Sequence, residues 1–365
     1  MIVYGSALTF ICLIAAIFSS RGWGKTSKVI FLFVSFLILF GISGFRAHNI
    51  GNDTNSYINF YEIVGYSSLD YLWDFYYEKG FVLLNKYLHI ISDNSQVLLI
   101  TTSFIIISSM MVFIYKNSNI VWLSVYLFIV MMFFYSSMNI MRQYLAMSLL
   151  VHSFNFAHRK KPVQFSATIL LATLFHKSSI IFGLVYFLNK IKFSYKILCL
   201  FSLVVILLFN WFYPFIEYIM IKTNQYGGYT SYFDSNKMGN IINAVVYGMI
   251  FVFGLFIKYY KESEPEAVKR ENAVRGKGNL LTLIAMITVG IAILSIRMSI
   301  LGRMVEYFSI FLIIFLPNII SVIKKKSIRI VSIILTVVFF SFYNIIIFVY
   351  RPEWYQATPF YFFVN

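Results

Sequence analysis

The sequence has few charged residues, few prolines and few cysteines. Of its 365 residues, 12% are charged and 60% are hydrophobic, and the mean hydropathy is +0.78. Soluble globular domains are about 25% charged and about 45–50% apolar. The composition therefore excludes a soluble enzyme, a disordered chain and a fibrous repeat, and it predicts a polytopic membrane protein.

The sequence also lacks the motifs of the common soluble enzymes. It contains no GxGxxG, P-loop, GxSxG or HExxH pattern, and no pair of His or Cys residues at a metal-ligand spacing. Cys12 and Cys199 both lie in apolar runs, where buried and unreactive thiols are expected. We therefore predict no metal site, no cofactor and no disulfide framework.

Positive charge dominates: the sequence has 30 Lys and Arg residues but only 14 Asp and Glu residues, and the net charge is +16. Such an excess is one signature of nucleic-acid binding. Here, however, the cations lie in short clusters between apolar runs, which is typical of the positive-inside rule for membrane proteins. We expect a lipid membrane around the chain and no nucleic-acid partner.

Apolar runs of about 20 residues are long enough to cross a bilayer as helices. The sequence predicts ten full spans in one all-α transmembrane domain over residues 1–365. The first span has no basic residue before it and no small-residue cleavage site, which argues against a cleaved signal peptide. The predicted spans are 2–20, 29–45, 97–115, 120–137, 139–157, 197–220, 239–257, 279–296, 304–323 and 330–350.

An eleventh apolar segment, residues 163–189, carries the polar sequence FHKSS at its centre. A single spanning helix would place His176 and Lys177 at the middle of the membrane, where charge is costly. Two half-helices that meet at this tip avoid the cost if the tip lies inside the protein, because broken backbone is tolerated only where it lines a cavity. We therefore predict a broken, re-entrant helix pair.

The distribution of cations sets the orientation. With the re-entrant pair, 20 of the 30 Lys and Arg residues fall on one face, whereas a single span would move the clusters at 258–277 and 324–329 to the other face. We predict that the basic face is cytoplasmic and that both termini are periplasmic. Residues 46–95 and 221–238 then form periplasmic loops, and residues 258–278 form a cytoplasmic loop. The stretch EKGFVLLNKYLHII in the first loop suits a short interfacial helix.

Polar residues near membrane depth are informative because each needs a partner or water. Under the predicted orientation the following residues lie on the periplasmic side: Arg46, Asp53, Glu78, Arg142, His176, Arg297, Arg303 and Glu306. Together they predict a polar cavity that opens outward. Structural roles remain open for several of them, such as snorkelling by Arg142, pairing of Arg303 with Glu306, or helix capping by Asp53.

The residue types suggest a chemistry. Guanidinium groups bind phosphate oxygens bidentately, so several arginines suit a diphosphate. Tyrosines in the periplasmic loops, including Tyr57, Tyr229 and Tyr232, suit the apolar faces of sugars, although an interfacial aromatic belt would look the same. A carboxylate or an imidazole can serve as general base toward a sugar hydroxyl.

Five motifs together resemble a known family, the EpsG-type, Wzy-like polymerases of O-antigen or capsular polysaccharide. They are GFRAHNIGNDTNSYINFYE, YEKGFVLLNKYL, MRQYLAMSLL, LFHKSSIIF and GRMVEYFSIF, and they span most of the chain. The resemblance implies a metal-independent glycosyltransferase of the bacterial inner membrane whose active site faces the periplasm. It transfers the growing glycan from undecaprenyl diphosphate to the non-reducing end of another lipid-linked repeat unit. A chain-length regulator and a flippase are implied as partners.

On this reading Arg142 and Arg303, with Arg297 and Arg46, hold the donor diphosphate. Asp53 or His176 activates the acceptor hydroxyl, and Glu78 orients a partner or is the alternative base. Two other classes of protein would have a similar cationic cavity: a flippase or transporter of lipid-linked oligosaccharide, and a transferase of another kind such as an O-antigen ligase. A transporter would show internal symmetry and cations reachable from both sides, and the sequence shows neither.

Overall fold

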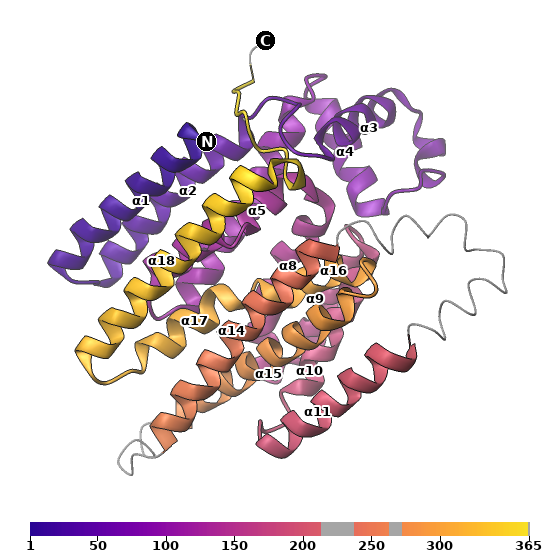
Figure 1. Ribbon diagram of the computed structural model, residues 1–365. Helices are drawn as coiled ribbons and strands as arrows, with labels where there is room; N and C mark the ends of the chain where they lie inside the picture. The colour runs from indigo at the N-terminus through magenta and orange to yellow at the C-terminus, as the bar shows by residue number, and fades with distance from the viewer. Residues whose placement is uncertain (213–236, 263–271, 364–365) are drawn as a thin grey trace. The chain divides into compact units, whose positions relative to one another are not determined.

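The computed structural model describes residues 1–212, 237–262 and 272–363 of the chain, and it is all-helical over these ranges (Figure 1). Because lipid offers no hydrogen bonds, apolar segments of this length satisfy their backbone groups internally as helices. The contacts group the chain into two compact units. The first comprises Met1–Ser153, Ser166–Ile180 and Lys324–Asn365, and the second comprises Phe154–Phe165 and Ile181–Ile323.

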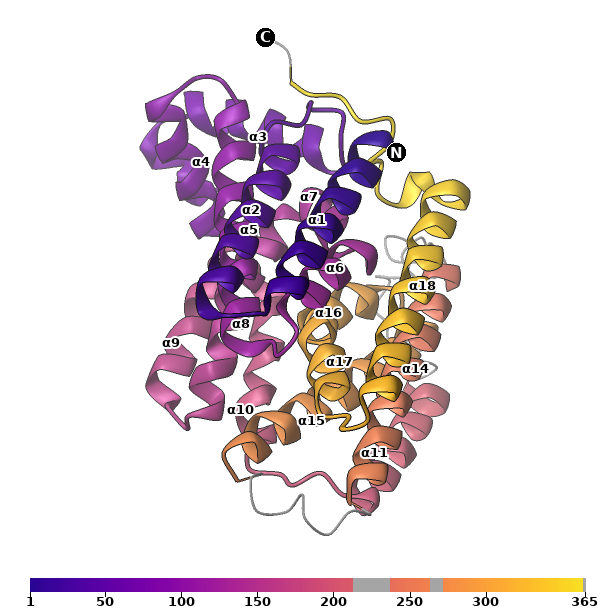
Figure 2. The same cartoon turned by 90° about the vertical axis from the view of Figure 1, so that its left-hand side faces the viewer.

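Four long helices form the body of the first unit. They are α1 (Ile2–Arg21), α2 (Lys25–Gly44), α5 (Gln96–Asn117) and α18 (Lys326–Tyr350). Figures 1 and 2 show that they run along a common axis. At one end of this body lie α3 (Thr54–Tyr66), the short 3-10 helix η1 (Leu69–Trp73) and α4 (Lys79–Ile91). The helix predicted from EKGFVLLNKYLHII is present as α4.

The second unit is built mainly from helices of the later part of the chain. They are α11 (Tyr195–Leu207) with the π-helical turn η3 (Leu208–Phe212), α14 (Lys237–Glu262), α15 (Asn272–Ser295), α16 (Ile300–Ser309) and α17 (Leu312–Ser321). Helices α14 and α15 extend into both ends of the predicted loop 258–278, because helical hydrogen bonding continues past the apolar residues. Residues 263–271 of that loop, and residues 221–236 of the second predicted periplasmic loop, lie outside the described residues.

Seven helices in the described part of the chain are long and apolar enough to cross a membrane, so the chain is a multi-pass membrane protein. They correspond to seven of the ten predicted spans. They are Ile2–Ser20, Lys25–Gly44, Gln96–Asn117, Lys237–Lys258, Lys277–Ser295, Ile300–Ser321 and Lys326–Tyr350.

The remaining three predicted spans are not among these seven helices. Span 120–137 is a bent pair, α6 (Val121–Val130) and α7 (Phe133–Asn139), with an angle of 52°. Met132 at the bend has φ +71°, and a left-handed residue cannot continue a right-handed helix. Span 139–157 is α8 (Met141–His158), whose polar residues make it less apolar than the seven. Span 197–220 is described only to residue 212, as α11 and η3.

Residues 163–189 fold back on themselves. Helix α9 (Pro162–Thr173) ends before the polar tip, and η2 (Lys177–Gly183) and α10 (Leu184–Leu188) follow it. Within the second unit, the side-chain amide of Asn189 donates to the carbonyl oxygen of Ala157 at 2.8 Å. The rings of Phe165 and Tyr186 are 5.4 Å apart. The chain therefore enters and leaves this segment at neighbouring points.

The residues after α18, which include the short 3-10 helix η6 (Pro352–Trp354), run back along the loop that follows α2. The amide of Ala47 donates to Tyr361, and the amide of Gly51 donates to Gln356. Gly51 has φ +99°, and a Cβ there would lie 2.7 Å from the hydroxyl of Thr54. This loop therefore depends on glycine and on the C-terminal segment for its shape.

Candidate functional site

Glu78, the residue before α4, is the centre of a charged cluster in the first unit. One carboxylate oxygen, Oε2, pairs with Nη1 of Arg142 on α8. The other, Oε1, accepts a hydrogen bond from the backbone amide of Lys177 at 3.1 Å and lies 3.3 Å from Nδ1 of His176. The side chain of Glu78 is only 9% exposed. One carboxylate thus connects α4, α8 and the tip of the re-entrant segment.

Gly80 allows the tip to come this close. Its backbone amide donates to the carbonyl oxygen of Leu174 at 2.8 Å, and a Cβ at residue 80 would lie 2.7 Å from the same oxygen. Real Cβ atoms do not approach backbone oxygens so closely. The glycine in YYEKG therefore positions His176 and Lys177 against Glu78.

Arg142 has two aromatic neighbours in addition to its ion pair. Its guanidinium carbon lies 4.1 Å from the centre of the Tyr77 ring, which is a cation–π contact. The hydroxyl of Tyr57 on α3 is a hydrogen-bond partner of the same guanidinium. Nε has no partner among the described residues, and 18% of the side chain is exposed. Because a guanidinium has five N–H donors, Arg142 keeps donors for a bound anion.

The electrostatics of the cluster keep Glu78 ionised. Burial by itself would raise the pKa of this carboxyl, but the contact with His176 and the charge of Arg142 outweigh burial and lower the pKa to about 2. Burial raises the pKa of Tyr57 to about 12. At neutral pH the site therefore holds a carboxylate and a protonated phenol beside a permanent guanidinium.

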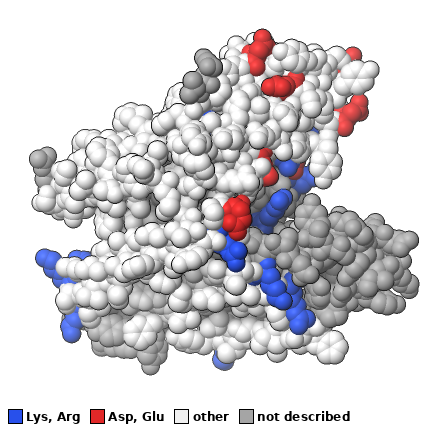
Figure 3. All heavy atoms as spheres, turned by 45° about the horizontal axis from the view of Figure 1, so that its top comes forward, with Lys and Arg blue, Asp and Glu red and all other residues white. Residues whose placement is uncertain are grey.

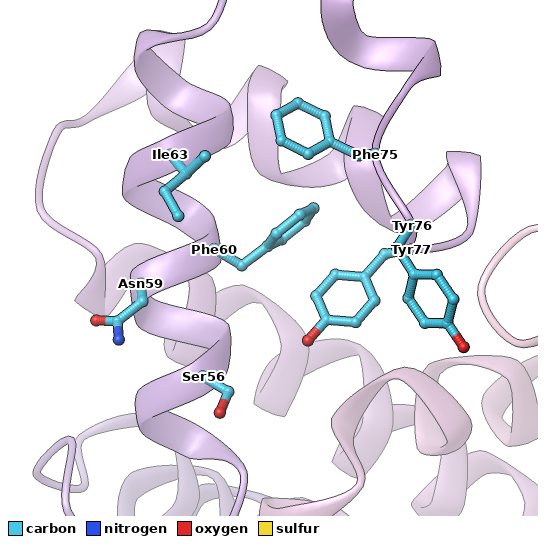
Figure 4. A pocket seen from close by; sticks show the side chains of 7 residues that line it. All are labelled: Ser56, Asn59, Phe60, Ile63, Phe75, Tyr76 and Tyr77. Atoms are coloured by element: carbon cyan, nitrogen blue, oxygen red, sulfur yellow. The ribbon is translucent and has the colours of Figure 1, made fainter. Parts of the chain in front are cut away.

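A pocket of about 380 Å³ lies next to the cluster. Figure 4 shows side chains of α3 on one side of it and the rings of residues 75–77 on the other. Tyr76 is 91% exposed, and the rings of Phe60 and Tyr77 meet edge to face at 4.4 Å. Tyr77 both lines the pocket and contacts Arg142. The lining residues are Ser56, Asn59, Phe60, Ile63, Phe75, Tyr76 and Tyr77.

Lys79 holds the aromatic loop in place. Its ammonium group donates to the carbonyl oxygens of Trp73 and Phe75, the latter at 2.9 Å. Tyr77 and Lys79 stand in the motif YEKGFVLLNKYL, but only Glu78 of its first three residues was selected as a candidate site residue. The run of aromatic residues next to EKG was the available signal.

Arg46 lies elsewhere in the first unit and is engaged by the backbone. It is 1% exposed, and its guanidinium donates to the carbonyl oxygens of Ser43, Ile50 (3.3 Å) and Met138 (3.1 Å). These contacts join the end of α2 to the end of α7. Arg46 therefore holds these backbone segments together, and its contact with a diphosphate stays a prediction. Asp53 precedes α3, makes no side-chain capping bond, and stands one helical turn before Tyr57.

The other predicted arginines belong to the second unit. Arg297 follows α15, with its guanidinium carbon 4.6 Å from the centre of the Phe209 ring. Arg303 lies on α16, three residues before Glu306. Tyr229 and Tyr232 lie outside the described residues. In the part of the chain that the structure describes, no group of three or more His, Cys, Asp or Glu residues could hold a metal ion.

The comparisons with known proteins give one match. No curated protein and no solved structure matches the chain. The model of the EpsG family matches residues 29–362. That range contains Glu78, Arg142, His176 and the aromatic pocket, as well as Arg297 and Arg303. The chain therefore belongs to the EpsG family.

Proposed function

We propose that this protein is a polysaccharide polymerase. It transfers a growing glycan from undecaprenyl diphosphate to the non-reducing end of another lipid-linked repeat unit, in O-antigen or capsule synthesis. Membership of the EpsG family supports a polymerase-like role. The observation that carries the proposal is the cluster of Glu78, Arg142 and His176 beside an aromatic pocket.

The reaction needs a base and an anion site. The acceptor hydroxyl oxygen attacks the anomeric carbon of the donor sugar, and the bond from that carbon to the diphosphate oxygen breaks. The diphosphate leaves with the electron pair, and the hydroxyl proton passes to the base. A diphosphate is a good leaving group, so the proposal requires positioning and charge stabilisation and no metal.

His176 is the base that the geometry favours. Glu78 lies 3.3 Å from Nδ1, which leaves Nε2 as the atom that accepts a proton. A carboxylate with a pKa of about 2 is a weak base, so the role of Glu78 is to position the imidazole through this contact. Asp53, close enough to Tyr57 to influence its pKa, is the second candidate for the base.

Arg142 binds the diphosphate in this proposal. The exposed fraction of its side chain, 18%, supports the assignment for Arg142. The charge of Glu78 keeps the guanidinium in place before the substrate arrives. Preorganised donors of this kind stabilise the negative charge that develops on the leaving group.

The aromatic pocket takes a sugar of the acceptor. The rings of Phe75, Tyr76 and Tyr77 offer flat apolar faces, and Ser56 and Asn59 offer hydrogen-bonding groups on the opposite wall (Figure 4). Tyr77 lines the pocket and also contacts Arg142. A sugar bound in the pocket therefore has its hydroxyl groups near the charged cluster. Tyr57 supports this arrangement from the Arg142 side.

We propose an inner-membrane location with the site and both termini in the periplasm. The first unit supports this orientation. Basic residues lie where α1 ends and where α2 and α18 begin, while the acidic residues gather at the opposite end, over α3 and α4 (Figures 1 and 3). The positive-inside rule places the basic end in the cytoplasm. A flippase and a chain-length regulator are the proposed partners.

A gel of surface polysaccharide tests the function. A strain that lacks the gene is compared with strains that carry the wild-type protein, Arg142→Ala or His176→Gln, each checked for its level in the membrane. A polymerase predicts one repeat unit on the lipid core and loss of the ladder in the deletion strain and both variants. Loss of the single-unit band as well would indicate a flippase or a ligase and would overturn the proposal.

A further inference from the structure

An apolar groove of about 330 Å³ lies in the second unit, and none of the residues that line it belongs to the charged cluster. Helix α11 and the turn η3 form one wall, α15 forms the other, and Phe251 of α14 also contributes. The groove extends along α11 from Leu198 to Asn210, a rise of about 18 Å at 1.5 Å per residue. A volume of about 330 Å³ spread over this length corresponds to a long and narrow groove.

Gly290 shapes the floor of the groove. A Cβ at this position would lie 2.4 Å from the ring of Phe201 and 3.1 Å from Val205. The ring of Phe201 therefore packs directly on the backbone of α15. A larger residue at 290 would push this ring into the groove and fill it.

One end of the groove carries a cation. Phe209 and Ile293 line that end, and the guanidinium of Arg297 lies 4.6 Å from the centre of the Phe209 ring. Asn210 adds an amide at the same end. The groove thus combines an apolar slot with a positive charge at its mouth, which matches the chemistry of an anionic lipid.

We infer that this groove binds the isoprenoid tail of a polyprenyl phosphate or diphosphate, with the phosphate at Arg297. The inference rests on the proposed function and adds a location for the lipid part of the substrate. The narrow slot favours a single chain over the two chains of a phospholipid. The charge at one end fixes the direction in which the chain lies.

Binding to the full-length protein in detergent tests the inference. Undecaprenyl phosphate is titrated into the wild type and into Ser202→Trp, and binding is measured by native mass spectrometry. Ser202 lines the groove and is exposed, so tryptophan fills the slot without disturbing a core. The matched control is Leu203→Trp, because Leu203 is the neighbouring residue, is 52% exposed and does not line the groove.

We expect Ser202→Trp to weaken binding roughly tenfold or more and Leu203→Trp to leave it unchanged. Arg297→Gln weakens binding of undecaprenyl phosphate but not of undecaprenol, and Arg297→Lys restores part of the difference. Equal binding by the two tryptophan variants would overturn the inference. So would competition by phosphatidylglycerol at the affinity of the polyprenyl phosphate, which would show a general lipid site.

The outcomes also separate this inference from the proposed function. If the polymerase assignment is wrong and the groove is right, wild-type protein binds undecaprenyl phosphate while the deletion strain keeps its polysaccharide ladder. If the groove is wrong and the assignment is right, the ladder is lost in the deletion strain. In that case the Ser202→Trp strain makes a normal ladder.

Discussion

Replacement of Glu78 by glutamine tests the charged cluster most directly. The change keeps the shape of the side chain and removes its charge, so Arg142 and His176 lose their common partner. A carboxyl pKa lowered from 4.5 to about 2 corresponds to about 3 kcal/mol in favour of the ionised form. Breaking a buried ion pair from one side costs about 3–5 kcal/mol, which agrees with this figure.

The lowered pKa of Glu78 determines how the stability of the fold changes with pH. The pKa of Glu78 in the folded protein lies below its ordinary value, so the ionised group stabilises the fold above pH 4.5 and this contribution is lost as the pH falls toward 2. Between pH 7 and pH 3 the free energy of unfolding of the wild type should fall by about 2 kcal/mol because Glu78 becomes protonated. This part of the fall should be absent from Glu78→Gln. The assay is the thermal unfolding midpoint of detergent-purified protein, measured across this pH range.

Glu62→Gln is the matched control, because Glu62 lies on α3 in the same acidic region and is exposed. It should follow the wild-type pH curve. If Glu78→Gln is as stable as the wild type at pH 7 and shows the same fall toward pH 3, the carboxylate does not hold the cluster together. The proposed role of Glu78 in the site would then be refuted.

Three further changes probe neighbouring contacts. Arg142→Lys keeps the charge but loses the planar donors, and we expect the polysaccharide ladder to shorten or disappear while the protein stays in the membrane. Lys79→Met frees the loop that carries Tyr77, so limited proteolysis should cut residues 73–77 faster than in the wild type. Gly80→Ala places a Cβ 2.7 Å from the carbonyl oxygen of Leu174, and the unfolding midpoint should fall by the equivalent of about 1–3 kcal/mol. A wild-type ladder from Arg142→Lys would remove the requirement for bidentate contact. Unchanged cleavage of Lys79→Met would mean that ring packing alone holds the loop. An unfolding midpoint of Gly80→Ala equal to that of the wild type would show that the tip of the re-entrant segment can move away from residue 80 without loss of stability.

The membrane character and most of the helices could be predicted because they depend on composition and on the length of apolar runs. Seven predicted spans correspond to helices of spanning length. The break at Met132 could not be predicted, since the run around it is apolar throughout and no Pro or Gly marks it. The bend depends on backbone geometry that packing imposes on an ordinary side chain.

The candidate site could be predicted in part. Glu78, Arg142 and His176 were selected because charge near membrane depth is costly, and the structure brings the three together. Arg46 was selected on the same ground, but its partners are backbone carbonyl oxygens from two distant segments. Sequence reveals that a buried cation needs partners, but it does not reveal whether a ligand or the backbone supplies them.

The pairing of the C-terminal segment with the loop after α2 has a consequence for the order of folding. The amides of Ala47 and Gly51 bond to residues 361 and 356, which the ribosome makes some 300 residues later. The loop that leads into α3 therefore stays incomplete while the helices between it and α18 insert. Contacts of such high sequence separation form slowly. The acidic end of the first unit should be the last part to reach its final shape, after the membrane helices are in place.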